Sequence, residues 1–337
     1  MTLSLSTSSP RTHRDRQGLT SPTTAAGTLL QQTDADQFYL PNTDCQVKAA
    51  VSLASLTSLR VGGPAEWYIA PRTPNEIAAG LRWATAANLP ITVLGAGSNL
   101  LISDRGLDGL VIGMRQLRTM QFDAATGQVT VDAGTSLVKL AWKAAEHGWR
   151  GLEWAVGIPG TVGGAVVMNA GAHGQETADI LVSTQVVAPD GQTQTLTPAQ
   201  LNYRYRTSNL QGSQRLVTRA VFQLQPGFDP AQVTQDTAAD LDQRRTSQPY
   251  HLPSCGSVFR NPTPQSAGWL IEQSGLKGYQ IGNAQIAERH ANFILNRGGA
   301  CASDVFRIIR SVQTRVQAQW DVQLQTEVKI LGDFAGV

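Results

Sequence analysis

Six glycines lie within the eighteen residues from Gly157 to Gly174, GIPGTVGGAVVMNAGAHG, and this run constrains the fold most strongly. Average glycine usage is about 7%. The run is too apolar for a flexible linker, and strand-like segments lie on both sides of it. Bare backbone in this setting can approach a large flat ligand and offer N–H and C=O groups to its edge. A tightly packed loop core is the alternative interpretation of the same residues.

A second glycine loop, LGAGSNLLISD at residues 94–104, follows a short apolar strand pattern. Gly95 and Gly97 allow close approach of the backbone to a ligand, and successive amides can point at phosphate oxygens. Ser98 and Asn99 add uncharged hydrogen bonds. The loop lacks the third glycine and following helix of a dinucleotide fingerprint, and no Lys-Ser/Thr makes it a Walker loop. It predicts a pyrophosphate cradle, with an ordinary strand-to-loop turn as the alternative.

Composition excludes several other classes of protein. A net charge of +2 gives no reason to expect nucleic acid or an anionic membrane surface as a partner. The three cysteines and five histidines are scattered without metal-ligand spacing, so neither a disulfide framework nor a metal site is expected. The chain has no run of eighteen apolar residues and no secretory signal. We therefore expect a cytoplasmic protein, and a monomer.

The polar residues 1–46 predict a disordered leader, a functional tail being the alternative, and the structural core is expected from about Val51. Residues 51–228 form the expected first region, with an α/β part at 51–117 and a strand-rich part at 118–228. Residues 229–337 form the second. Further expected elements are a capped helix from Thr73 to about Asn88, a helix at 136–147, a hairpin across 189–191, helices after Pro230, at 266–274 and from an N-cap at Ser303, and a final strand, VQLQTEVKI.

Three further segments carry residues suited to chemistry. YRYRTS at 203–208 supplies Arg206, whose fixed charge and donor fork suit a carboxylate or a developing enolate. In SCGSVFRNP at 254–262, Ser257 can direct its hydroxyl into a pocket. Glu327 alternates with the apolar residues of the final strand, a pattern that is usually explained by a solvated face. Taken alone, each segment is more often explained by a surface arginine, a turn serine or a surface carboxylate.

The two glycine loops and the three segments above resemble, in their order along the chain, the motifs of the UDP-N-acetylenolpyruvoylglucosamine reductase family. The resemblance extends to TSLRVGGPAEW, AGWLIEQSGLKGYQIGNAQIAERHANFILN and EVKILG. The resemblance covers roughly residues 56–332, and the short spacing between YRTS and GSVFRNP is similar to the type II branch. It implies an α+β fold with a two-lobed FAD-binding region of the vanillyl-alcohol-oxidase (PCMH) type, followed by a C-terminal α+β substrate-binding domain.

The resemblance also implies non-covalent FAD as the cofactor and NADPH as co-substrate. The implied small-molecule substrate is UDP-N-acetylglucosamine enolpyruvate, whose reduction would give UDP-N-acetylmuramate for peptidoglycan synthesis. The implied cofactor contacts are Arg60 and two groups of loop residues: Gly95, Gly97, Ser98, Asn99 and Leu100, then Gly157, Gly160, Thr161, Gly163 and Gly164.

By the same resemblance, Arg206 and Glu327 stabilise enolate charge on the substrate, and Ser257 donates a proton to its α-carbon. An ionised carboxylate would repel an enolate, so Glu327 is expected to be protonated or to act through a hydrogen bond. The resemblance also suggests Tyr205, Asn261 and Arg245 as substrate contacts, with a solvated helix face as the alternative for Arg245.

Two positions depart from the family pattern. His173 stands where tyrosine is common, and Ser247 where a basic residue is common. Two rival functions remain open. Another flavin oxidoreductase or oxidase of the same fold would often tether FAD through a histidine or cysteine. A catalytically inactive nucleotide-binding module would not need Arg206, Ser257 and Glu327 together.

Overall fold

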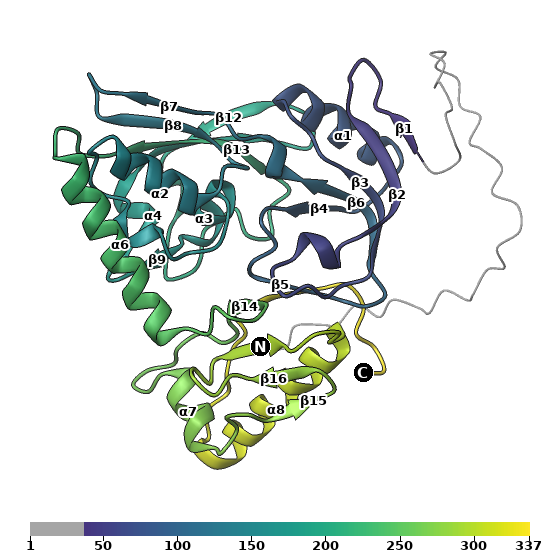
Figure 1. Cartoon of the computed structure of the whole chain (residues 1–337). Helices are drawn as coiled ribbons and strands as arrows, with labels where there is room; N and C mark the ends of the chain where they lie inside the picture. The colour runs from purple at the N-terminus through teal and green to yellow at the C-terminus, as the bar shows by residue number, and fades with distance from the viewer. Residues whose placement is uncertain (1–36) are drawn as a thin grey trace, which may run out of the picture.

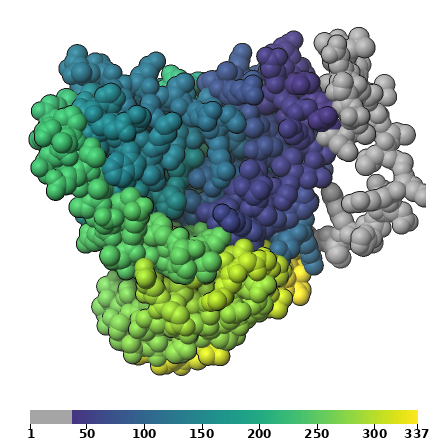
Figure 2. Space-filling view, viewed as in Figure 1, coloured from purple at the N-terminus to yellow at the C-terminus, as the bar shows by residue number. Residues whose placement is uncertain are grey.

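The computed structural model describes residues 37–337, in two bodies stacked one above the other (Figure 1). The upper body holds two five-stranded sheets with their helices, and the lower body is a smaller sheet packed on a long helix. In the space-filling view the C-terminal residues, coloured yellow-green, lie directly against the upper body (Figure 2). Residues 1–36 of the predicted disordered leader, 1–46, lie outside the described residues. The prediction was wrong for residues 37–46, because β1 (Gln37–Tyr39) pairs with the start of β2 (Gln46–Ser52) there.

The first lobe is a mixed sheet with the strand order β1-β2-β3-β6-β4. Thr73 caps the helix α1, Pro74–Ala86, through its side chain, as predicted, and Ile77, Leu81 and Ala84 are buried on one face of this helix. The carboxylate of Glu76 accepts from the Arg72 amide, so the capping box is not reciprocal. The strands are β1 Gln37–Tyr39, β2 Gln46–Ser52, β3 Pro64–Ile69, β4 Ile91–Leu94 and β6 Leu107–Gly113.

The second lobe is an antiparallel sheet with the order β12-β11-β13-β8-β7. Helix α2, Leu137–Glu146, lies within the predicted residues 136–147; its N-cap is Ser136, and it ends before Gly148. One continuous cluster of buried side chains extends through both lobes. The strands are β7 Met120–Asp123, β8 Gln128–Asp132, β11 Leu181–Val187, β12 Thr193–Leu196 and β13 Leu216–Gln223. The short elements are β9 Gly171–Ala172, β10 Gln175–Glu176, α4 Thr177–Ile180, α5 Pro198–Leu201 and a 3₁₀ turn at 153–155; two further 3₁₀ turns, at 54–56 and 114–116, lie in the first lobe.

The lower body is an antiparallel sheet, β14-β17-β16-β15, packed on the helix α8, Ala302–Trp320. The apolar residues at helical spacing on α8, including Val305, Ile308 and Val312, are fully buried in a second core. The remaining elements are β14 Ser254–Ser257, α7 Ala267–Gln273, β15 Gln280–Ile281, β16 Ala284–Ile286 and β17 Phe293–Asn296.

The chain end returns to the upper body. β18, Lys329–Leu331, pairs in parallel with β5, Leu100–Ile102, which follows directly from the second glycine loop. Helix α6, Pro230–Ser247, leaves the second lobe and lies along α2 (Figure 1). Its Val233 is fully buried, although the sequence analysis grouped this helix with the C-terminal region. The proposed boundary near residue 228 therefore precedes a helix that packs on the upper body.

Four expectations need correction. The core begins before Val51, because Leu40, Cys45 and Val47 are buried beneath the β1–β2 pair. The glycine run is not only loop, since Val162–Met168 form the helix α3. The final strand is restricted to β18, and residues 322–325 are irregular. Helix α8 begins after Cys301, with Ser303 inside its first turn.

The cap of α8 comes from a distant residue. The Asp104 carboxylate accepts from the amides of Ala302 and Ser303 at 2.7 and 2.8 Å, which satisfies donors that a local N-cap would otherwise bind. No helix among residues 37–337 combines the length and apolar character needed to cross a bilayer.

Candidate active site

The two glycine loops lie against each other at the junction of the lobes. The Ser98 hydroxyl donates to the Pro159 carbonyl at 2.5 Å. A Cβ on Gly95 would lie 2.6 Å from Thr161 Oγ1, and Gly97, at φ +65°, would overlap the Leu56 carbonyl. Glycine is therefore required at both positions by close packing and, at Gly97, by the backbone conformation.

The loops offer a set of unused hydrogen-bond donors. Within residues 37–337, the amides of Gly97, Ser98, Asn99, Gly160 and Thr161 have no protein acceptor. A Cβ on Gly160 would meet only the Ser98 hydroxyl, at 3.7 Å, so open space lies beside this backbone. Successive free amides beside open space suit phosphate oxygens and the edge of a flat ring system, as in FAD.

Arg115, which the sequence analysis missed, holds the second glycine loop in place. Its guanidinium donates to the carbonyls of Gly95, Ala96 and Leu56 at 3.3, 2.6 and 2.8 Å. These bonds turn the carbonyls of the loop toward Arg115. Arg60 is exposed in the adjacent turn, with φ +57°, two residues after Ser58, whose amide donates to the Gly97 carbonyl at 3.1 Å.

Arg206 and Glu327, 121 positions apart in the chain, form an ion pair with Nε and Oε1 separated by 3.3 Å. Both side chains are largely buried, 22% and 17% exposed. The Arg206 guanidinium also donates to the carbonyls of Asn169 and Gly171 at 3.4 and 2.7 Å, and its backbone has φ +53°. Such a conformation is uncommon for a residue with a side chain and persists where its surroundings hold it.

The backbone around Glu327 joins this pair to the Ser257 segment and to the glycine loop. The Glu327 amide donates to the Val258 carbonyl at 2.8 Å, directly after Ser257 at the end of β14. The Asn99 side-chain amide donates to the Glu327 carbonyl at 3.2 Å. Arg206, Glu327, the Ser257 segment and Asn99 therefore lie at one place.

Burial raises the pKa of Glu327 above the usual value of a carboxyl group. The positive charges of Arg206, Arg260 and Lys329 oppose this increase. The carboxyl group is therefore easier to protonate than a solvated glutamate. It does not lie on the exposed face that strand alternation usually indicates.

Arg260, Lys329 and Gln211 also belong to this cluster, although the sequence analysis did not single them out. Lys329 Nζ donates to Gln211 Oε1 at 2.8 Å, and Gln211 Nε2 donates to the Arg206 carbonyl at 2.9 Å. The Arg260 guanidinium reaches the same carbonyl at 3.5 Å. Arg260 lies inside the FRNP segment and Lys329 inside EVKILG. Their place in these family motifs was the sequence signal that could have identified them.

The three predicted substrate contacts, Tyr205, Asn261 and Arg245, lie at different places in the fold. Tyr205 is 51% exposed, with its ring 5.0 Å from the Arg206 guanidinium carbon. Asn261 Oδ1 accepts from the Ala267 amide at the start of α7. Arg245 lies on α6, faces Asp242 at 3.5 Å and is not part of the Arg206–Glu327 cluster. His173 is exposed, and the Ser247 hydroxyl bonds back to carbonyls of its own helix.

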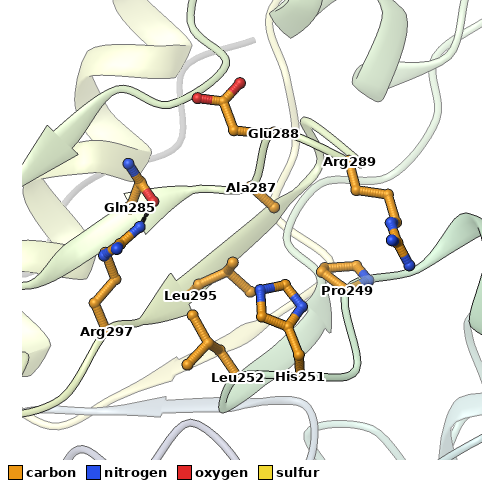
Figure 3. A pocket seen from close by; sticks show the side chains of 9 residues that line it. All are labelled: Pro249, His251, Leu252, Gln285, Ala287, Glu288, Arg289, Leu295 and Arg297. Carbon is orange, nitrogen blue, oxygen red and sulfur yellow. Dashed lines mark hydrogen bonds between the residues drawn. The ribbon is translucent and has the colours of Figure 1, made fainter.

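A pocket of about 280 Å³ opens in the lower body (Figure 3). Its lining includes the apolar side chains Leu252, Ala287 and Leu295, while His251, Glu288, Arg289 and Arg297 supply polar groups. Arg289 donates to the Arg245 carbonyl at 3.1 Å, so the pocket lies beside the end of α6. Leu295 pairs with Ser254 across β14 and β17, three residues before Ser257. The remaining lining residues are Pro249 and Gln285.

These features and the family matches define the class of protein. Residues 65–197 match the model of an FAD binding domain, and residues 248–331 match the C-terminal domain of UDP-N-acetylenolpyruvoylglucosamine reductase. The chain is thus an FAD-binding oxidoreductase with the predicted α+β fold, a two-lobed FAD-binding region followed by a C-terminal domain. It belongs to the UDP-N-acetylenolpyruvoylglucosamine reductase family, as the following relatives show.

Similar proteins of that name occur in several cyanobacteria. The chain is 63% identical to the reductase of Nostoc sp. strain PCC 7120 over 88% of this chain and 90% of the relative. It is 54% identical to that of Synechocystis sp. strain PCC 6803 over 88% and 94%. The crystal structure of the Thermus caldophilus reductase superposes with a TM-score of 0.71 at 38% identity, over 84% of this chain and 98% of that one.

Proposed function

We propose that this enzyme reduces UDP-N-acetylglucosamine enolpyruvate to UDP-N-acetylmuramate, with NADPH as the reductant, in peptidoglycan precursor synthesis. The observation that carries the proposal is the buried Arg206–Glu327 pair, joined to the Ser257 segment on one side and to the glycine loop by Asn99 on the other. Bound FAD, once reduced, supplies the hydride that adds to the terminal methylene carbon of the substrate.

Hydride addition leaves carbanion character beside the substrate carboxylate, and this charge delocalises as an enolate. Arg206 is held by three protein acceptors, so its charge is preorganised and needs little rearrangement as the enolate forms. Glu327, with its raised pKa, donates a hydrogen bond in the protonated form and avoids repulsion of the enolate. In this mechanism Ser257 donates the proton to the α-carbon.

The pocket in the lower body suits the nucleotide end of the substrate. Its apolar lining residues can accept a pyrimidine ring, and Arg289 beside the end of α6 can bind a phosphate group. Leu295, in the pocket lining, pairs with Ser254, which lies three residues before Ser257 on the same strand. Three residues of strand span on the order of 10 Å, so Ser257 lies about that far from the pocket. A nucleotide sugar can span that distance.

The test is an anaerobic titration of the flavoprotein. NADPH should bleach the flavin absorbance, and addition of UDP-N-acetylglucosamine enolpyruvate should restore it. Failure of the substrate to restore absorbance would refute the proposed reaction. Release of the flavin after acid denaturation and filtration should confirm that it is non-covalent, whereas retention would favour a covalently flavinylated oxidase.

Replacement of the proton donor separates the two half-reactions. Ser257→Ala should leave bleaching by NADPH intact and slow the substrate-dependent recovery about 10²- to 10⁴-fold, the usual contribution of general acid catalysis. Stopped-flow absorbance of each half-reaction measures both rates. If bleaching is lost and recovery is not, Ser257 is not the proton donor.

A further inference from the structure

The Arg260 guanidinium lies beside the Arg206–Glu327 pair, and most of its N–H donors have no acceptor among the described residues. Its backbone amide donates to the Gln325 carbonyl at 2.9 Å, which fixes Arg260 beside the segment that carries Glu327. Within residues 37–337, its side chain has a single acceptor, the Arg206 carbonyl, at the long distance of 3.5 Å. A guanidinium has five N–H donors, so most of those of Arg260 are available to a ligand.

The neighbouring cations are already engaged. Each guanidinium nitrogen of Arg206 has a protein partner: Glu327, the Asn169 carbonyl and the Gly171 carbonyl. Lys329 donates to Gln211 at 2.8 Å. Arg260 is therefore the member of the cluster with the most free hydrogen-bonding capacity.

The charge balance of the cluster points to an anion. Arg206, Arg260 and Lys329 surround one carboxylate, Glu327, and the charges of all three act on it. Positive charge is thus in excess by two when Glu327 is ionised, in a partly buried setting where uncompensated charge is costly. A planar carboxylate matches the donor fork of a guanidinium and accepts two parallel hydrogen bonds from it.

We propose that Arg260 binds the carboxylate of the enolpyruvyl group, beside the fixed Arg206 and Glu327, which stabilise the enolate charge that develops there. This assignment rests on the proposed function, which supplies a substrate with that carboxylate. It makes Arg260 the residue that distinguishes the enolpyruvyl or lactyl nucleotide sugar from the same sugar without the acid group.

Two nucleotide sugars that differ in the acid group test the assignment. UDP-N-acetylmuramate carries a carboxylate, and UDP-N-acetylglucosamine does not. Each is titrated by calorimetry into the oxidised, FAD-loaded enzyme. The unmodified enzyme should bind the muramate more tightly. Arg260→Gln should weaken muramate binding about 10- to 100-fold, as expected for loss of a charge-assisted bond, and change binding of UDP-N-acetylglucosamine less than about threefold.

Two further variants control for charge and folding. Arg310 is exposed on α8, so Arg310→Gln removes one positive charge and should change neither affinity. Arg260→Lys keeps the charge without the fork and should lose part of the preference for muramate. Retention of full preference in both Arg260 variants, or equal weakening of both ligands, would overturn the assignment. Absence of a preference for the muramate in the unmodified enzyme would also overturn it. The proposed function fails separately, if the enolpyruvyl substrate does not reoxidise the reduced flavin of the unmodified enzyme.

Discussion

Glu327 shows how far the chemistry of a residue depends on groups that are remote in the chain. Its neighbours in sequence alternate between apolar and polar residues, so local patterning predicts a solvated carboxylate. In the fold, Arg206 contacts its carboxylate, the Val258 carbonyl binds its amide, and Asn99 binds its carbonyl. Burial then raises its pKa, whereas the nearby cations lower it. The balance between these two effects determines whether the group is protonated.

Lys329 provides a way to change that balance by one charge. If protonated Glu327 is the active form, turnover falls as the pH rises through its pKa. Lys329→Met removes a cation that lowers this pKa, so the pKa should rise and the alkaline fall in kcat should move to higher pH. A pH profile of steady-state turnover measures the shift.

The conservative variant separates charge from shape in that experiment. Lys329→Arg keeps the positive charge and should keep the alkaline fall near its original pH. The pKa of Lys329 is itself lowered by burial and by Arg260, so its own titration is the competing explanation. If Lys329→Met abolished the alkaline fall instead of moving it, Lys329 would be the group that titrates.

At the scale of elements, the sequence predicts best where local rules decide the structure. Thr73 caps its helix as expected, α2 lies within the predicted residues 136–147, and the buried face of α8 follows its apolar spacing. The start of α8 was misplaced because Asp104, in another body, supplies the cap. The helix α3 was missed because its sequence, VGGAVVM, has low intrinsic helix propensity, and packing against β8 and β13 supports it.

The glycine loops allow a test of why glycine is needed at each position. Gly160 has room for a methyl group within the protein, so a requirement for glycine there must come from the ligand. Gly160→Ala should fold normally and weaken FAD binding by about 1–3 kcal/mol, or about 5- to 150-fold. Flavin fluorescence titration of the apoprotein measures the affinity, and circular dichroism checks the fold.

Gly97→Ala is the matched comparison. A methyl group there would overlap the Leu56 carbonyl and would force a side chain into a positive φ, so both folding and flavin binding should suffer. Unchanged flavin affinity in Gly160→Ala would show that Gly160 does not lie along the cofactor. Close packing would then remain the reason for glycine at Gly95 and Gly97.

Across the whole molecule, the candidate site depends on chain segments that meet only when both bodies are in place. Arg206 comes from the second lobe, Ser257 from the lower body, and Asn99 from the first lobe. β18 adds to β5 in parallel and brings Glu327 and Lys329 to the glycine loop. Family motifs could name these residues, but pairings between segments so far apart are not encoded in any local pattern.

This arrangement predicts that FAD stabilises β18 as well as the loops it contacts. Asn99 bonds to the backbone on both sides of Val328, through the Glu327 carbonyl and the Lys329 amide. A ligand that orders the 95–100 loop should therefore raise the free energy of opening of β18. The increase should reach up to about 2.7 kcal/mol at a free FAD concentration of 100 times Kd. Hydrogen exchange of apoprotein and holoprotein should show added protection at Lys329–Leu331 and at the loop. Helix α7 makes none of these contacts, so the exchange rates of its amides should change little on FAD binding. Added protection confined to the glycine loops would show that FAD binding does not stabilise β18.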